Sequence, residues 1–201
     1  MCDTLDSLGP EISACRLCAD RFAATATAHQ PRPVFWLAAG ARILVAGQAP
    51  GARVQASGVP FDDASGDRLR DWMGLDRTAF YDREKIAILP MAFCFPGYDA
   101  RGADLPPPRL CAATWHTRVM QAAGHFDVIL LVGGHAQKWH MPAAKGVTET
   151  VRNWRAGAPA VFTLPHPSWR NTGWLKANPW FTAGVLPALR AAVAKALKGQ
   201  T

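Results

Sequence analysis

Residues 43–51 read Ile-Leu-Val-Ala-Gly-Gln-Ala-Pro-Gly, a short apolar run followed at once by a turn-forming loop. The run at residues 43–46 has the length and composition of a strand that is buried on both faces. The two glycines around Pro50 predict a sharp turn whose backbone can approach a ligand closely, although an ordinary strand-to-loop turn can have the same sequence. The stretch therefore predicts a buried strand with a candidate ligand loop at its carboxyl end.

Similar apolar runs recur along the chain, with helical patterns between them. The further strands are expected at residues 34–38, 86–89, 128–132 and 160–164. Helices are expected at residues 4–24, 69–73, 110–123 and 185–197, the last with one apolar stripe through four turns. This alternation favours a three-layer α/β fold with a mainly parallel central sheet, in which ligands bind beyond the carboxyl ends of the strands.

Length and charge narrow the class of protein. The 201 residues are expected to form one domain, residues 1–201, and a net charge of +7 favours an acidic partner such as nucleic acid. No apolar run approaches the ~20 residues that cross a bilayer, so we expect no membrane association. The first twelve residues lack the pattern of a signal peptide, and we therefore expect a cytoplasmic protein.

A second loop with chemical potential is His166-Pro167-Ser168, directly after the run at residues 160–164. A histidine at the carboxyl end of a strand can donate a hydrogen bond to developing negative charge, whereas the plain alternative is a satisfied polar residue. Aromatic, basic and amide side chains follow it, and this mixture is typical of a surface that binds a nucleic-acid backbone. The residues expected to contact DNA here are Trp169, Arg170, Asn171 and Lys176.

A third segment, Gly-Val-Pro-Phe-Asp-Asp at residues 58–63, combines an aromatic ring with two carboxylates. Phe61 could stack on a flat base, and Asp62 and Asp63 could orient water. Two alternatives stay open: Phe61 belongs to the core, or the acidic residues, with Asp67, begin a helix whose dipole they complement.

Four of the five cysteines form a pattern: Cys15-x-x-Cys18, then Cys94 and Cys111. A C-x-x-C pair brings two thiolates to one metal, and two later cysteines complete the four-sulfur shell that an iron–sulfur cluster or zinc accepts. The alternative is a set of small buried apolar residues. Cys2 is left over, and the odd count argues against a disulfide framework.

In this order along the chain, the loops resemble the uracil-DNA glycosylase superfamily, most closely its family 4, the iron–sulfur enzymes of bacteria and archaea. Members of family 4 have a C-x-x-C pair near their start, a Gly-Glu-Ala-Pro-Gly loop, a Gly-x-Pro-Phe segment, two further cysteines and a late His-Pro loop. The resemblance spans roughly residues 12–198, and the joint match is far more specific than any single motif.

The resemblance implies a central four-stranded parallel sheet between helices and a monomeric DNA-repair enzyme. Such an enzyme flips uracil out of DNA and hydrolyses its N-glycosidic bond, which releases free uracil and leaves an abasic site. A structural [4Fe-4S] cluster would be held by the four cysteines, with zinc as the alternative. Phe61 would stack on the base, and His166 would stabilise the leaving anion. From the basic, tryptophan-rich character of the late loop itself, we expect Arg170, Lys176 or the adjacent Leu175 to help fill or brace the gap left in the duplex. The remaining base-binding positions would be Gly47, Ala49, Pro50, Gly51 and Ser168.

The sequence departs from family 4 at two positions. Gln48 replaces the glutamate of the first loop, and an amide cannot take up a proton near neutral pH, so Asp62 or Asp63 is expected to supply the charge while Gln48 positions water. Pro90 stands where family 4 has an asparagine that reads the uracil edge, so reading is expected from the backbone at Met91 or from the Gln48 amide.

These departures leave other readings open. The range of bases excised could include hypoxanthine or other deaminated bases. A protein on the same scaffold could bind uracil or abasic sites without turnover, or a histidine could attack the sugar covalently. A metal-stabilised nucleotide-binding domain with no role on DNA is a further alternative.

Overall fold

The computed structural model describes residues 3–199, and Cys2 lies outside this range. Its four strands form one sheet in the order β2-β1-β3-β4, and all three neighbouring pairs are parallel. The strands are β1 (Ile43–Ala46), β2 (Ile86–Ile88), β3 (Val128–Val132) and β4 (Val161–Leu164). The expected α/β fold with a four-stranded parallel sheet is thus confirmed.

Apolar side chains of the strands alternate between two cores. Ile43 and Val45 of β1 pack into one cluster and Leu44 into another, because successive side chains of a strand point to opposite faces of its sheet. All three are fully buried. The strands are therefore covered on both faces, which explains why they are continuous apolar runs.

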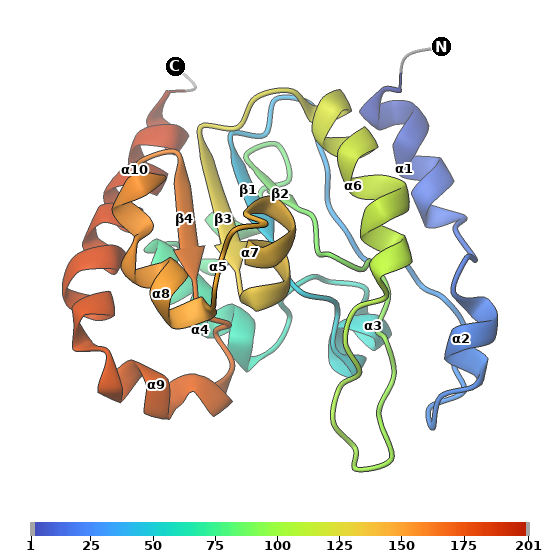
Figure 1. The fold of residues 1–201 in the computed structure, drawn as a ribbon. Helices are drawn as coiled ribbons and strands as arrows, with labels where there is room; N and C mark the ends of the chain where they lie inside the picture. The colour runs from blue at the N-terminus through green and yellow to red at the C-terminus, as the bar shows by residue number, and fades with distance from the viewer. Residues whose placement is uncertain (1–2, 200–201) are drawn as a thin grey trace.

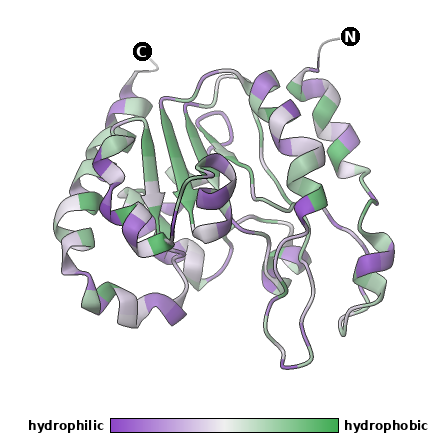
Figure 2. Ribbon diagram, in the orientation of Figure 1, coloured by the Kyte–Doolittle hydropathy of each residue, from purple (hydrophilic) through white to green (hydrophobic). Residues whose placement is uncertain are grey.

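Helices form a layer on each face of the sheet (Figure 1). Residues of α4 (Ala64–Met73) and α10 (Leu186–Lys198) pack into the core that contains Val45. Residues of α1 (Leu5–Ser13) and α6 (Arg109–Ala123) pack into the opposite core, with Leu44. Figure 2 shows hydrophobic strands at the centre and hydrophilic residues concentrated on the outer helices and loops. The predicted helices at residues 69–73, 110–123 and 185–197 are confirmed within slightly different bounds.

The other helices are short. They are α2 (Ala19–Ala23), α3 (Ala52–Ser57), α5 (Arg77–Phe80), α7 (Gly134–His140), α8 (Val147–Arg152) and α9 (Thr172–Ala177). A five-residue π-helical turn, Phe181–Val185, leads into α10. Among the described residues, no helix is long and apolar enough to span a membrane.

Two expected elements were wrong. Residues 4–24 do not form one helix: α1 ends at Ser13, and a turn that contains Cys15 separates it from α2. Residues 34–38 do not form a strand, since Trp36 makes only an isolated antiparallel bridge with Ile88. The backbone N–H of Val34 instead donates to the carbonyl of Phe93, beyond the end of β2, so the segment leaves the sheet after one pairing.

Candidate active site

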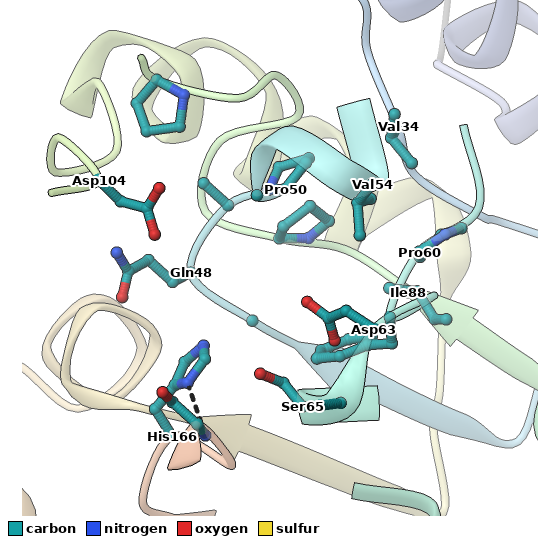
Figure 3. A pocket seen from close by; sticks show the side chains of 18 of the residues that line it. Val34, Gln48, Pro50, Val54, Pro60, Asp63, Ser65, Ile88, Asp104 and His166 are labelled. Carbon is teal, nitrogen blue, oxygen red and sulfur yellow. Dashed lines mark hydrogen bonds between the residues drawn. The ribbon is translucent and has the colours of Figure 1, made fainter. Parts of the chain in front are cut away.

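A cavity of about 540 Å³ opens beyond the carboxyl ends of the strands. The loops that follow β1, β2 and β4 line it, together with the segment that leads into α4 (Figure 3). This is the edge at which parallel α/β sheets bind ligands, because loops from neighbouring strands converge there.

Most of the residues predicted from the sequence meet in this cavity. Those that line it are Gly47, Gln48, Ala49, Pro50, Gly51, Phe61, Asp63, His166, Ser168, Trp169, Arg170 and Asn171. Those outside the lining are Asp62, Met91, Leu175 and Lys176. Three loops far apart in the sequence thus form one site.

The first loop is fixed by hydrogen bonds to the segment that follows β2. The backbone N–H of Met91 donates to the carbonyl of Gly47 (2.9 Å), and the N–H of Ala92 donates to the carbonyl of Gln48 (3.1 Å). Met91 has no second backbone donor, and its side chain is buried. The Met91 N–H is therefore already used, so the expected reading of the base by this backbone segment would fall to a carbonyl acceptor and stays a prediction.

Phe61 both packs on the core and lines the cavity. Its ring meets Phe80 edge-on, with centroids 6.1 Å apart. Its backbone has a φ of 55°, in the left-handed region that non-glycine residues rarely adopt. Its carbonyl oxygen accepts hydrogen bonds from the Arg70 guanidinium (3.2 Å) and the Tyr81 hydroxyl (3.0 Å), which hold this conformation. The ring is therefore a fixed wall of the cavity.

Glycine at position 47 makes room for that ring. A Cβ atom there would lie 3.3 Å from Cζ of Phe61, which is tighter than ordinary contact. A side chain at this position would require the Phe61 ring to shift, so glycine lets the loop after β1 lie close over the ring.

The two adjacent carboxylates have different surroundings. Asp63 lines the cavity, but one of its oxygens accepts from the backbone N–H of Gly66 (2.9 Å) and caps α4. Asp62 is hydrogen-bonded to Arg77 (2.7 Å), and this bond holds the pKa of its carboxyl below the ordinary value. The helix-capping alternative is thus confirmed for Asp63, and Asp62 is committed to an ion pair.

His166 presents a neutral imidazole to the cavity. Its Nδ1 accepts from the backbone N–H of Ser168 (3.2 Å), which assigns the ring proton to Nε2. Burial lowers the pKa of the ring, against the opposing effect of Asp63 and Asp104. The Asn171 amide donates to the His166 carbonyl (2.7 Å) and fixes the loop. The result is an oriented N–H donor that is uncharged at neutral pH.

The segment after His166 is exposed at the rim of the cavity. The Trp169 side chain is 73% exposed, and the Arg170 guanidinium lies 5.9 Å from its ring centroid. Lys176 is exposed on α9, whereas Leu175 is half-buried and packs against the core. The rim therefore carries an aromatic and a basic group, while Leu175 is not presented at the cavity.

Sequence reasoning missed Asp104, which lines the same cavity. It lies on the long connection between β2 and α6, sixteen positions beyond Ile88. The antiparallel bridge between Tyr98 and Asp104 folds this connection back toward the site. No local motif marks the residue. The sequence did show that it follows β2, and the loop after the neighbouring strand β1 also belongs to the site.

The four cysteines converge on a second, small apolar cavity of about 20 Å³. Cys15 and Cys18 come from the turn between α1 and α2, Cys94 from the segment after β2, and Cys111 from the first turns of α6. Burial raises the pKa of Cys94 and of Cys111 to about 12. Within residues 3–199, no three His, Cys, Asp or Glu side chains stand close enough to hold a metal ion without movement.

The chemistry of this set fits a four-thiolate group. The cavity is lined by all four sulfurs and otherwise by apolar side chains, so four thiolates there require a cation to offset their charge. Binding would draw the sulfurs inward, as ligand sites commonly form together with the metal. The structural observation is that the four cysteines line one cavity, although their side chains do not yet lie at the spacing of metal ligands.

A buried histidine contacts the wall of the larger of the two cavities. His116 is fully buried in α6, and its Nε2 donates to the carbonyl of Pro90 (2.7 Å), a residue of the cavity wall. Burial, opposed by this hydrogen bond and reinforced by nearby His140, lowers the pKa of His116 to about 4. The neutral ring is therefore part of the folded structure.

This predicts a loss of stability in weak acid. The unfolded chain takes up a proton on His116 below about pH 6.5 and the folded chain only near pH 4, so its contribution is present above pH 6.5 and is lost as the pH falls toward 4. We expect His116 to make the free energy of unfolding, measured with urea, about 2 kcal/mol lower at pH 5 than at pH 7.5. His116→Gln should reduce the difference between the two pH values, whereas the exposed-site control His125→Gln should keep it. Equal pH dependence in all three proteins would contradict the prediction.

Comparison with protein families gives one match over most of the chain. Residues 15–190 match the family model described as the uracil DNA glycosylase superfamily. The matched span contains every loop that lines the cavity and all four converging cysteines.

Proposed function

The chain belongs to the uracil-DNA glycosylase superfamily, and we propose that it excises uracil from DNA by hydrolysis of the N-glycosidic bond, acting as a monomer. The observation that carries the proposal is the neutral, oriented imidazole of His166 in a cavity with an aromatic wall. Excision requires the base to leave the stack and enter such a cavity. The products would be free uracil and an abasic site.

The cavity offers complementary surfaces to a flipped base. The Phe61 ring supplies a flat apolar face, and the loop after β1 closes over it at Gly47. His166 can donate from Nε2 to a uracil carbonyl, where negative charge develops as the glycosidic bond breaks. A neutral imidazole suits this role. It keeps its N–H proton throughout, and its hydrogen bond to the carbonyl strengthens as negative charge grows there.

Recognition of uracil is expected to differ from that in family 4. Pro90 contributes no side-chain donor to the cavity wall, and the N–H groups of Met91 and Ala92 are already bonded. The Gln48 amide, which lines the cavity, carries both a donor and an acceptor that can pair with a base edge (Figure 3). Without the asparagine that reads the uracil edge in family 4, the site should distinguish uracil from other bases less sharply. The test should therefore include other deaminated bases.

The test is turnover on a defined oligonucleotide. Labelled strands that contain one uracil, hypoxanthine, thymine mismatch or normal base are incubated with enzyme at one-tenth of the substrate concentration. Release of many equivalents of uracil supports the proposal. Release that stops at one equivalent identifies the damage-binding alternative, which Gln48 favours because it removes the family carboxylate from this loop. An adduct that survives denaturant identifies covalent attack, and no release from any strand overturns the proposal.

The exposed rim is proposed to contact the DNA backbone. Changing both Arg170 and Lys176 to Ala removes two exposed cations, one at the cavity and one on α9. Affinity for a uracil duplex should therefore fall roughly tenfold at moderate salt, and the log–log salt slope should decrease by about 2. Fluorescence anisotropy across a salt series measures both quantities. The matched control changes Lys195 and Lys198, at the far end of α10, to Ala. Equal effects of the two pairs would show that only net charge matters.

We further propose that Cys15, Cys18, Cys94 and Cys111 hold a [4Fe-4S] cluster, as in family 4. The group would supply a structural tie between the α1–α2 turn, the segment after β2 and the start of α6. We expect purified protein to contain about four iron atoms per chain and to absorb in the visible range. Cys94→Ser should lower the iron content and the melting temperature, whereas Thr114→Ser on α6 should change neither. Finding stoichiometric zinc and no iron would show that the four cysteines hold zinc and not the cluster.

A further inference from the structure

The charges in the cavity raise a question that the family resemblance leaves unanswered. With Gln at position 48, the first loop offers no carboxylate, yet hydrolysis at a sugar carbon is helped by one that orients water and offsets positive charge. Among the described residues that line the cavity, only Asp63 and Asp104 are acidic. These two are therefore the candidates.

Asp63 already has a structural role as the N-cap residue of α4. Its Oδ1 accepts from the Gly66 N–H at the start of α4, so the carboxylate is bound to the helix terminus. One oxygen of Asp63 is therefore engaged in capping the helix, which leaves this carboxylate less available to orient water than one without a hydrogen bond.

Asp104 has the opposite surroundings. Within residues 3–199, its carboxylate forms no hydrogen bond or ion pair with another side chain or backbone group. Its charge nevertheless acts on His166, whose pKa it tends to raise. In Figure 3 the Asp104 carboxylate and the Gln48 amide point toward one another on one side of the cavity, with His166 beyond Gln48. An uncommitted carboxylate thus faces the position that lacks one.

The loop that carries Asp104 is well supported. Asp99 accepts from the N–H groups of Arg101 (2.8 Å) and Ala103 (2.9 Å), and its own N–H donates to the Ala103 carbonyl (2.8 Å). At its base, the N–H of Leu105 donates to the Gly97 carbonyl (2.9 Å). These bonds close the loop on both sides of its tip, so Asp104 has a defined place at the mouth of the cavity.

We propose that Asp104 is a catalytic residue, the carboxylate that acts together with Gln48 on the attacking water. This inference rests on the proposed glycosylase function. The water oxygen forms a bond to C1′ of the sugar, the C1′–N1 bond breaks, and uracil leaves as an anion bound to His166 Nε2–H. Gln48 orients the water through its amide, and the water proton passes to the Asp104 carboxylate, from which solvent removes it.

The experiment measures single-turnover excision from a uracil oligonucleotide between pH 4.5 and pH 8. Asp104→Asn should lower the rate roughly 100-fold at neutral pH. Asp104→Ala, measured in parallel, should show the same loss. The control is Asp6→Asn, an exposed carboxylate on α1, which should keep the wild-type rate and profile.

A reciprocal variant tests the partnership with Gln48. Adding Gln48→Glu to Asp104→Asn places a carboxylate on the first loop, and the rate should recover at least tenfold. Asp104 variants within twofold of wild type, or no recovery with Gln48→Glu, would overturn the inference. If the wild-type protein releases no base, the proposed function itself fails, so the two failures are distinct.

Discussion

His166→Ala is expected to lower single-turnover uracil excision by on the order of 10²- to 10³-fold, which is the effect of removing one oriented donor to a developing anion. The structure gives the reason. Nδ1 is occupied by the Ser168 N–H, so Nε2 carries the proton into the cavity. Because burial lowers the ring pKa, the donor stays neutral and the contribution should be nearly constant from pH 7 to pH 8.

Two measurements separate this chemical role from a structural one. The affinity of His166→Ala for a uracil duplex and its melting temperature should stay close to those of wild type, because the ring faces a cavity. His166→Gln keeps an N–H donor and should recover part of the rate. His125→Ala, at an exposed histidine before β3, is the matched control. A rate for His166→Ala within threefold of wild type would show that the leaving base is stabilised elsewhere.

Gly66→Ala is expected to have the largest effect on folding. A Cβ at this position would lie 1.8 Å from the Phe61 carbonyl oxygen and 2.7 Å from its carbon, and backbone atoms cannot move aside as a flexible side chain can. The added methyl would also break the bonds from Arg70 and Tyr81 that converge on the same oxygen. We expect a loss of about 3 kcal/mol or more in the free energy of unfolding.

Differential scanning calorimetry and urea unfolding measure this loss, which corresponds to a decrease of roughly 6–12 °C in melting temperature for a chain of this size. The control is Gly9→Ala, within α1, where a Cβ meets no atom within 4 Å. That change should be neutral or stabilising, since alanine favours the helix. Excision should also fall in Gly66→Ala, because Phe61 forms a wall of the cavity. A stability equal to that of the Gly9→Ala control would show that the backbone at Phe61 yields easily.

The sequence was most informative where local composition and tertiary environment agree. Strands buried on both faces must be apolar throughout, so β1 and β3 could be identified from residues 43–46 and 128–132 alone. Loops at the ends of these strands must meet at one edge, which is why Gln48 and His166 could be placed in one site before any coordinates.

The rest depends on contacts between distant segments. Residues 34–38 are as apolar as a strand, but the bond from Val34 to Phe93 turns the segment away from the sheet. The turn after Ser13 places Cys15 and Cys18 at one cavity, which helical periodicity could not reveal. Asp104 reaches the site because its loop folds back on itself, and no pattern near the residue encodes that return.

The connection from β2 to α6 carries both sites in turn. It lines the larger cavity at Pro90, the cavity of the four cysteines at Cys94, the larger cavity again at Asp104, and the cysteine cavity again at Pro108, just before Cys111 on α6. Each of these positions is set by how many residues separate it from the next. During divergence, exchange of side chains at the loop tip should be tolerated, whereas insertion or deletion of even one residue between Cys94 and Asp104 would shift the carboxylate out of register. Its length, more than its composition, is therefore what the geometry of the two cavities constrains.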